Sequence, residues 1–270
     1  MNLLELKIID TLKNLKENYH ICGIKTEFET EGTSREEIFR LKDITVKTDL
    51  EFTIKISGCG SVRDMYDAKS IGINTMVAPM IESPYALGKY LQTARRIFTE
   101  DEFNSIKFFI NIETVSGFNC LEEILSSGYA KDLGGIVVGR TDMAESLGMS
   151  KDDVNHEIIF GYTEIITKKA LEYGKEVIIG GGVSAESLQF FSRLPLLSKF
   201  ETRKVIFDAK TALKMPDIDK GILKALEFEL LWLKNKRETY GIVFKEDEIR
   251  LQILEARYKK LFEEVNGACV

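Results

Sequence analysis

The chain has 270 residues, with 37 Lys and Arg against 43 Asp and Glu, 44% hydrophobic residues, four cysteines and four prolines. This composition is ordinary for a globular protein and excludes a disordered or collagen-like chain. The net charge of −6 disfavours binding along a nucleic-acid backbone, which needs a basic face. No apolar run approaches the ~20 residues of a membrane span, and the N-terminus lacks a signal-peptide pattern. The cysteines have no CxxC or Cys/His spacing, so we expect reduced thiols in a cytoplasmic protein.

Short β-rich runs alternate with amphipathic helical stretches along most of the chain. A predicted helix occupies the first 20 residues, and its apolar stripe is Leu4, Ile8, Leu12 and Leu15. Seven predicted strands follow, at 22–28, 52–57, 75–80, 107–113, 135–139, 176–180 and 204–208. Several are apolar on both faces, as parallel strands covered by helices are. The pattern therefore predicts a parallel sheet, either closed as a barrel or open and doubly wound.

Capping signals mark the helices between these strands. Thr33 or Ser34, each with a glutamate three residues later, can begin the first of them. Ser61 and Asn119 have the same spacing to an acid. Ser83 is followed by Pro84, which suits the first turn of a helix.

Polar side chains lie in or just after separate predicted strands: Glu27, Glu29, Lys55, Glu82, Glu113, Asp142 and Asp208. In an α/β barrel all these strand ends open onto one face, whereas an open sheet gathers ligands only at its switch point. No GxGxxG or GxxxxGK[ST] motif follows a strand. We therefore predict a (β/α)8-type TIM barrel with seven visible strands. The eighth is absent or degenerate, or the N-terminus fills its place.

The alternation of predicted strands and helices ends after Pro216. The segment 217–265 contains no strand–helix unit but two apolar helical stripes, with a break at 241–244. The first stripe is Ile222, Leu226, Leu230 and Leu233, and the second is Ile249, Ile253, Leu254, Leu261 and Phe262. We therefore expect a barrel domain at 1–215 and a C-terminal helical extension at 216–270. The extension either covers the base of the barrel or packs against a neighbouring subunit.

Two carboxylates form the sharpest constellation. Glu113 and Asp142 each stand at the end of a predicted strand, and one helix separates them, so they come from adjacent barrel strands. Two hard oxygen ligands with open positions for water and substrate suit Mg²⁺ or Mn²⁺. The structural alternative is that Glu113 caps a loop and Asp142 begins a helix.

Three segments carry a resemblance: INIETVSGFNCLEEIL, GGIVVGRTDMAESLGM and DAKSIGINTMVAPMIES. With them, the stretch from about residue 23 to 208 resembles the HpcH/HpaI aldolase and citrate lyase β-subunit family of phosphoenolpyruvate/pyruvate barrels. The resemblance implies that Glu113 and Asp142 bind Mg²⁺ or Mn²⁺, which chelates a 2-keto acid. It also implies that backbone N–H groups of Thr141 and Asp142 hold the substrate carboxylate, with Gly139 permitting close approach. Arg140 would bind a distal carboxylate or form an outward-facing salt bridge.

Two positions depart from the family pattern. Lys55 stands where the family has an arginine that touches the keto oxygen; alternatively it is an interior lysine paired with Glu27 or Glu29. In the first strand Glu27 and Glu29 match the family's acids, but Thr30 occupies the position of its catalytic histidine. The two histidines of the chain, at 20 and 156, do not stand there. Either glutamate would act as the base, or the reaction needs none.

The resemblance thus predicts a metal-dependent carbon–carbon lyase of the aldolase or citrate lyase type, acting on a small 2-keto acid through an enolate. The nearest enzymatic alternative is a citrate synthase-like or acyl-CoA condensing enzyme on the same site. A non-catalytic keto-acid-binding or scaffold protein is the alternative from another class. Family members are commonly trimers or hexamers, so we expect a homo-oligomer without a nucleic-acid or membrane partner.

Overall fold

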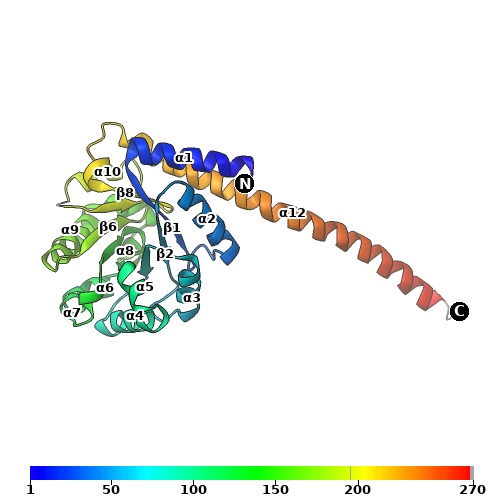
Figure 1. The fold of residues 1–270 in the computed structure, drawn as a ribbon, viewed down its shortest axis with the longest axis horizontal. Coiled ribbons are helices and arrows are strands. Elements are labelled where there is room, and N and C mark those ends of the chain that lie inside the picture. The colour runs from blue at the N-terminus through cyan, green and yellow to red at the C-terminus, as the bar shows by residue number, and fades with distance from the viewer. Residues whose placement is uncertain (195, 268–270) are drawn as a thin grey trace.

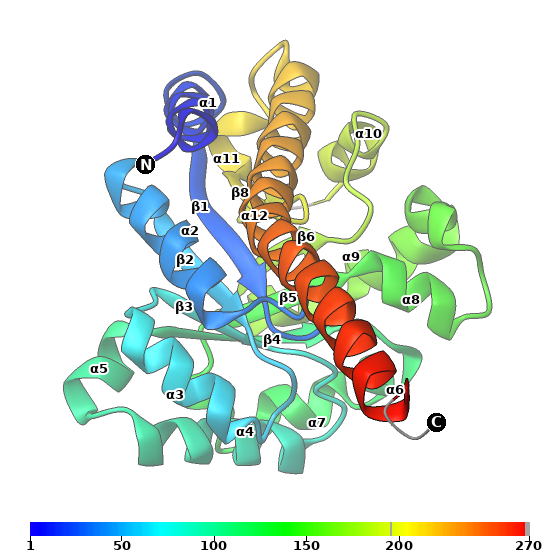
Figure 2. The same cartoon turned by 90° about the vertical axis from the view of Figure 1, so that its right-hand side faces the viewer.

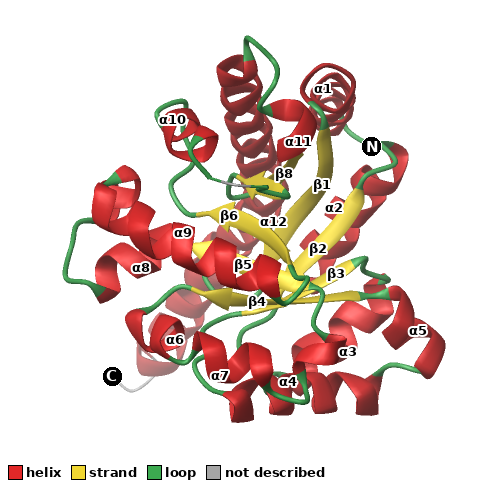
Figure 3. Ribbon diagram, turned by 90° about the vertical axis from the view of Figure 1, so that its left-hand side faces the viewer, coloured by secondary structure: helices red, strands yellow, loops and turns green. Residues whose placement is uncertain are grey.

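The computed structural model describes residues 1–194 and 196–267. Eight strands close into one barrel in chain order, with helices around its outside (Figure 1, Figure 3). The strands are β1 (Ile21–Glu27), β2 (Glu51–Lys55), β3 (Thr75–Ala78), β4 (Lys107–Ile112), β5 (Gly135–Gly139), β6 (Glu176–Gly180), β7 (Lys199–Glu201) and β8 (Val205–Asp208). The predicted TIM-barrel class is confirmed, and each of the seven predicted strands overlaps an observed one.

The helices follow the strands in the expected alternation. They are α1 (Leu3–Tyr19), α2 (Arg35–Lys47), α3 (Val62–Ile71), α4 (Pro84–Ile97), α5 (Glu100–Ser105), α6 (Val115–Asn119), α7 (Leu121–Ser126), α8 (Arg140–Ser146), α9 (Glu157–Glu172), α10 (Ser187–Ser192), α11 (Ala209–Ala212) and α12 (Ile218–Gly267). Two 3₁₀ turns, η1 (Ala130–Asp132) and η2 (Lys151–Asn155), complete the connections. Among the described residues, no helix combines the length and the apolar character needed to cross a membrane.

Local caps explain where several of these helices begin. Ser34 and Glu37 form a capping box at α2, and Ser83 caps α4 with Pro84 in its first turn, both as predicted. Two other predicted caps are wrong. Ser61 makes no capping bond, because Asp64 instead accepts the backbone N–H of Ser57. Asn119 lies at the end of α6 rather than at the start of a helix.

The strand that the sequence pattern misses is β7, which is only three residues long. It pairs parallel with β6, but β8 runs antiparallel to both β7 and β1, so β7 and β8 form a hairpin. Asp208 therefore lies at the opposite end of the barrel from the other strand ends, where its N–H donates to the carbonyl of His20 (3.0 Å). The expectation that Asp208 opens onto the same face is wrong, because a hairpin reverses the direction of β8.

The core forms two layers. Most buried apolar side chains pack between the strands and the surrounding helices. A separate cluster of Val77, Phe109, Val137 and Ile178 comes from the four consecutive strands β3 to β6. Because alternate residues of a barrel strand point inward, this small cluster lies inside the barrel and forms a floor beneath its open end.

The C-terminal segment is one helix of 50 residues, α12, and the predicted break at 241–244 is wrong. Its first part runs antiparallel to α1: Gly221 lies against the ring of Tyr19, and the Asn2 side chain donates to Asn235 Oδ1 (2.6 Å). Here Phe228 and Trp232 are buried. Beyond this part the helix extends away from the barrel into solvent (Figure 1, Figure 2). The division at 215/216 stays a prediction.

Candidate active site

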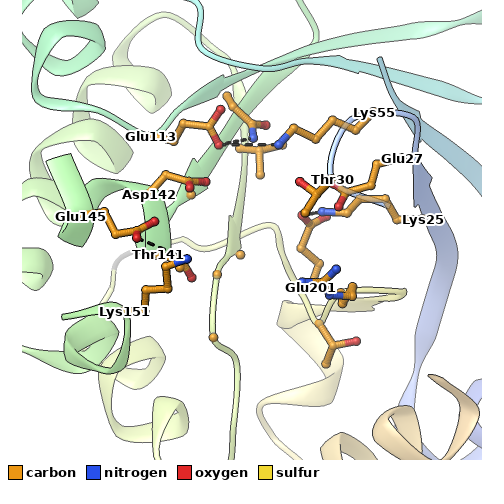
Figure 4. A pocket seen from close by; sticks show the side chains of 18 residues that line it. Lys25, Glu27, Thr30, Lys55, Glu113, Thr141, Asp142, Glu145, Lys151 and Glu201 are labelled. Atoms are coloured by element: carbon orange, nitrogen blue, oxygen red, sulfur yellow. Dashed lines mark hydrogen bonds and ion pairs between the residues drawn. The ribbon is translucent and has the colours of Figure 1, made fainter. Parts of the chain in front are cut away.

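A cavity of about 250 Å³ opens at the carboxyl ends of the strands (Figure 4). Its wall contains Lys25, Glu27, Thr30, Lys55, Asn111, Glu113, Val137, Gly139, Thr141, Asp142, Glu145, Lys151, Gly180, Gly181, Gly182, Glu201, Thr202 and Arg203. The structure thus brings together Glu27, Lys55, Glu113, Gly139, Thr141 and Asp142. Glu29 and Arg140 are outside the cavity wall.

Glu113 is the most buried carboxylate of the metal pair that the resemblance implies, with 2% of its surface exposed. It directly follows β4, and both of its oxygens are held. Oε1 accepts the backbone N–H of Met80 (2.9 Å), and Oε2 accepts Nδ2 of Asn111 (2.7 Å). Met80 has a φ of 46°, a left-handed conformation that costs a non-glycine residue energy. This strained turn after β3 aims its N–H at Glu113.

Burial raises the pKa of Glu113, and the charge of Asp142 adds to that rise. The Lys55 ammonium and the hydrogen bonds from Asn111 and Met80 act in the opposite direction but do not cancel it. Glu113 is therefore a buried carboxylate whose charge the protein only partly compensates. Such a group gains most from a cation placed beside it.

Gly139 allows Glu113 and the start of α8 to lie side by side. A Cβ at this position would stand 2.8 Å from both Cβ and Oε2 of Glu113, so no larger residue fits without displacing the carboxylate. α8 then begins at once, and its first turn carries Thr141 and Asp142 into the cavity wall. Gly139 therefore allows the backbone at the start of α8 to lie close to the Glu113 side chain.

Lys55, at the end of β2, points into the same cavity and is 8% exposed. Its Nζ lies 2.8 Å from Glu29 Oε2 and 3.9 Å from Glu113 Oε2. Burial by itself lowers the pKa of Lys55, but Glu113 and Glu29 raise it by more, so the net shift is upward. The side chain is therefore a fixed ammonium. Its pairing with Glu29 was one of the two predicted alternatives.

The sequence from residue 39 to 176 matches the family model of the HpcH/HpaI aldolase/citrate lyase proteins, which covers just over half of the chain. The chain belongs to this family. None of the curated proteins matches the sequence.

Solved structures of HpcH/HpaI proteins share the fold. A family protein from Burkholderia cenocepacia J2315 is 14% identical, with a TM-score of 0.57 over 72% of this chain and 83% of that chain. An HpcH/HpaI aldolase from Desulfitobacterium hafniense DCB-2 is 12% identical, with a TM-score of 0.60 over 75% and 84%. The citrate synthase SbnG is 14% identical, with a TM-score of 0.60 over 87% and 90%. At these identities the likeness establishes the barrel.

The oxygen atoms of the side chains in this cavity fit a divalent metal ion. Glu113 and Asp142 offer hard oxygens from neighbouring elements, as Mg²⁺ and Mn²⁺ prefer. Asn111 is 5% exposed, and its buried Oδ1 has no hydrogen-bond partner within the described residues. No group of three or more His, Cys, Asp or Glu side chains assembles a metal site within that part of the chain.

Arg140 is a correction to the prediction. Its side chain is fully buried behind the cavity and packs on the rings of Phe190 and Phe191. Its guanidinium donates to the carbonyls of Gly180 (3.1 Å) and Gly181 (2.8 Å), to Val154 O, Asn155 Oδ1 and Ser187 Oγ. Burial lowers the pKa of Arg140 to about 9. Both expectations, a substrate contact and an outward salt bridge, are wrong, because these bonds use the side chain to join the loops after β5 and β6.

Neither histidine of the chain lines the cavity. His20 caps the end of α1 next to the opposite end of the barrel. His156 begins α9, and its Nδ1 accepts the backbone N–H of Ile158 (3.2 Å). Thr30, which the sequence resemblance matches to the family histidine, is in the cavity wall. Of the two candidate bases, Glu27 lines the cavity, whereas Glu29 is paired with Lys55.

The side of the cavity that the β7–β8 hairpin builds is not predicted from the sequence. Glu201 on β7 is 3% exposed and forms an ion pair with Lys25 of β1. Lys204, in the hairpin turn, is buried and forms an ion pair with Glu31. The signal available was the short KFETRKVIFD segment, where Phe200 and the apolar run 205–207 flank a polar turn.

Proposed function

We propose that this HpcH/HpaI protein is a metal-dependent carbon–carbon lyase that acts on a small 2-keto acid. The observation that carries the proposal is the convergence of Glu113, Asp142 and Lys55 on one cavity above the floor of the barrel. Glu113 and Asp142 would hold Mg²⁺ or Mn²⁺, with Asn111 Oδ1 beside them. The ion, when bound, would chelate the carboxylate and keto oxygens of the substrate and stabilise negative charge there.

Cleavage of a 4-hydroxy-2-keto acid would proceed as follows. A base takes the proton of the C4 hydroxyl, the C3–C4 bond breaks, and an aldehyde leaves. The bonding electrons form an enolate whose charge lies on the former keto oxygen, and a proton delivered to C3 then gives the 2-keto acid. Lys55, held as an ammonium by Glu29 and Glu113, would face this developing charge. The same charge disfavours a Schiff-base role, which needs a neutral amine.

We propose Glu27 as the base that moves this proton. It is at the end of β1 in the cavity wall. Within the described residues its carboxylate forms no hydrogen bond and no ion pair, and it interacts with Lys55 and Lys204 only through their charges. Glu29 is occupied by Lys55 (2.8 Å), and Thr30 has no basic group. Backbone N–H groups of Thr141 and Asp142 would hold the substrate carboxylate.

The test is proton exchange at the methyl group of pyruvate. The protein is incubated with Mn²⁺ and pyruvate in D₂O, and deuterium incorporation is followed by mass spectrometry after removal of the metal. We expect exchange that requires both the protein and the ion, and that is lost in a variant carrying Glu113→Ala and Asp142→Ala. Binding of pyruvate without exchange would contradict the lyase and favour a non-catalytic keto-acid-binding protein. Unchanged Mn²⁺ affinity in the double variant would contradict the metal assignment.

A citrate synthase-like condensation on the same site is the second candidate. It is favoured by Thr30, because no histidine of the described chain lines the cavity, and by the likeness in fold to the citrate synthase SbnG. This reaction also begins with an enolate, so exchange alone does not separate the two. Assays with a panel of 4-hydroxy-2-keto acids, and with oxaloacetate plus an acyl-thioester, would separate cleavage from condensation.

A further inference from the structure

An apolar stripe, interrupted at two positions, runs along the exposed side of α12, from beside the barrel to the free part of the helix. Its members recur at spacings of three and four residues, the period of a coiled-coil seam. They are Leu223, Leu226, Leu230, Leu233, Tyr240, Phe244, Leu251 and Leu254, all 49–70% exposed. Two charged residues, Arg237 and Asp247, fill the remaining positions of the seam and are exposed as well.

This seam is separate from the face that α12 buries against its own chain. Ile222, Ala225, Phe228 and Trp232 pack inward, whereas Leu223, Leu226, Leu230 and Leu233 point outward on the same turns. Further along, every side chain described between Phe244 and Lys259 is exposed. The molecule therefore has two exposed apolar stretches, one on the barrel-bound part of the helix and one on its free part.

We propose that a second copy of this chain covers both stretches, with the two α12 helices packed antiparallel about a two-fold axis near Ile242. The two charged seam residues decide the register. They stand five residues on either side of position 242, so this arrangement places Arg237 opposite the partner's Asp247, and the reverse. Neither residue forms an ion pair within the described part of its own chain.

The same register matches the apolar positions. Leu230 meets the partner's Leu254, Leu233 meets the partner's Leu251, and Tyr240 meets the partner's Phe244. Each pair occurs twice by symmetry, so the free part of each helix covers the barrel-bound part of the other. The interface is isologous and closes on itself as a dimer.

Other pairings of the seam are less favourable. A parallel, in-register pair would place Arg237 against the partner's Arg237 and Asp247 against the partner's Asp247. An antiparallel pair in which one helix is slid by one heptad along the other would place Asp247 against the partner's Leu230 or the partner's Phe244. Both leave buried charges without a counter-charge, which costs far more than a matched pair.

The surface beside the barrel-bound stretch has room for the partner's helix. A groove of about 710 Å³ runs between α1 and α12, and its wall includes Tyr19, Leu223, Leu226 and Leu230. Three leucines of the seam thus line this groove. A helix lying along the seam would therefore bury the edge of α1 as well as the leucines.

The oligomeric state tests the proposal. Sedimentation at micromolar concentration should give a mass of two chains, twice 30.7 kDa, or an even multiple of it. L251E together with L254E should halve that mass while the barrel keeps its thermal transition. The matched control is I249E with I253E, which places the same charges on the opposite face of the same turns. A monomeric wild-type protein, or equal loss of mass in the control, would overturn the proposal.

A charge exchange tests the register. R237D places two acids opposite each other in the antiparallel dimer, and D247R places two arginines there, so each should weaken dimerisation at least about tenfold. The double variant R237D/D247R restores both ion pairs and should recover the wild-type dissociation constant. K245D and E246R, outside the seam, are the controls. Weak single effects without recovery in the double variant would favour parallel pairing and overturn the antiparallel assignment.

Discussion

The two sides of the cavity handle buried charge in opposite ways. On the hairpin side two acids pair with lysines, the buried Glu201 with Lys25 and the half-buried Glu31 with Lys204. On the side of β2, β4 and β5, Glu113 is equally buried, but its nearest cation is 3.9 Å away and its pKa is raised. On the hairpin side the carboxylate charges are neutralised by lysines of the same chain. On the Glu113 side a carboxylate charge remains that a bound ligand could neutralise.

The largest expected effect is that of Glu113→Gln, which changes the side of β2, β4 and β5 and leaves the hairpin side unchanged. The amide keeps the shape of the side chain but loses the charge that would hold a metal ion, so we expect kcat to fall at least about a thousandfold. Mn²⁺ affinity, measured by titration calorimetry, should fall in parallel. The matched control is Glu145→Gln, a carboxylate of the same cavity wall that is paired with Lys151. Retained activity in Glu113→Gln would contradict the assignment of this side.

The same substitution should stabilise the metal-free protein at neutral pH. The folded-state pKa of Glu113 lies above its ordinary value of 4.5, so the folded state favours the protonated form. That favourable contribution is fully present below pH 4.5 and is lost as the pH rises through the raised pKa. Wild-type protein should therefore be the less stable of the two at pH 7. The difference, measured by urea unfolding, should shrink as the pH falls toward 4.5.

The hairpin side should respond in stability. Glu201→Met leaves the half-buried ammonium of Lys25 without its partner, and we expect a loss of about 3 kcal/mol in the free energy of unfolding. Removing both charges with Lys25→Met and Glu201→Met should restore most of that loss, because a well-packed apolar pair avoids the desolvation of two ions. A double variant as unstable as the single one would contradict this explanation, because it would show that the ion pair itself stabilises the fold.

The difference between the two sides also explains what could be predicted from the sequence. Glu113 and Asp142 follow long, apolar strands, so their convergence follows from the period of the barrel alone. β7 has three residues and no helix before β8, and such a short hairpin gives almost no periodic signal; Lys25 and Glu201 were missed with it. Arg140 was misassigned because position after a strand does not say which way a side chain turns. α12 continues through Gly241 and its weak helix-forming neighbours because strong helix formers lie on either side of the 239–244 stretch.

Gly139→Ala should have a smaller effect on the reactive side. The new Cβ would stand 2.8 Å from Glu113 Oε2, so the carboxylate must shift. We expect roughly tenfold weaker Mn²⁺ binding and about 2 kcal/mol lower stability, as for other overpacked sites. Gly161→Ala is the control, because no atom lies within 4 Å of the new Cβ in α9. Equal Mn²⁺ affinity in both variants would show that Glu113 is not constrained by this contact.

Lys55→Arg is the finest test, because it keeps the charge that the comparison depends on and changes only its shape. Glu29 and Glu113 raise the pKa of Lys55, so the lysine stays charged until well into the alkaline range and its ion pairs stabilise the fold there; that contribution is lost as the pH rises through the raised pKa. An arginine would still pair with Glu29, so we expect kcat within a few-fold of wild type, whereas Lys55→Met should lose about a hundredfold. The pH profile of kcat/KM separates the interpretations. If Lys55 acts as a fixed charge, the profiles of the lysine and arginine enzymes should coincide up to about pH 9. An alkaline limb that disappears in Lys55→Arg would show that the amine itself exchanges a proton during the reaction, and the site would then need a different base from Glu27.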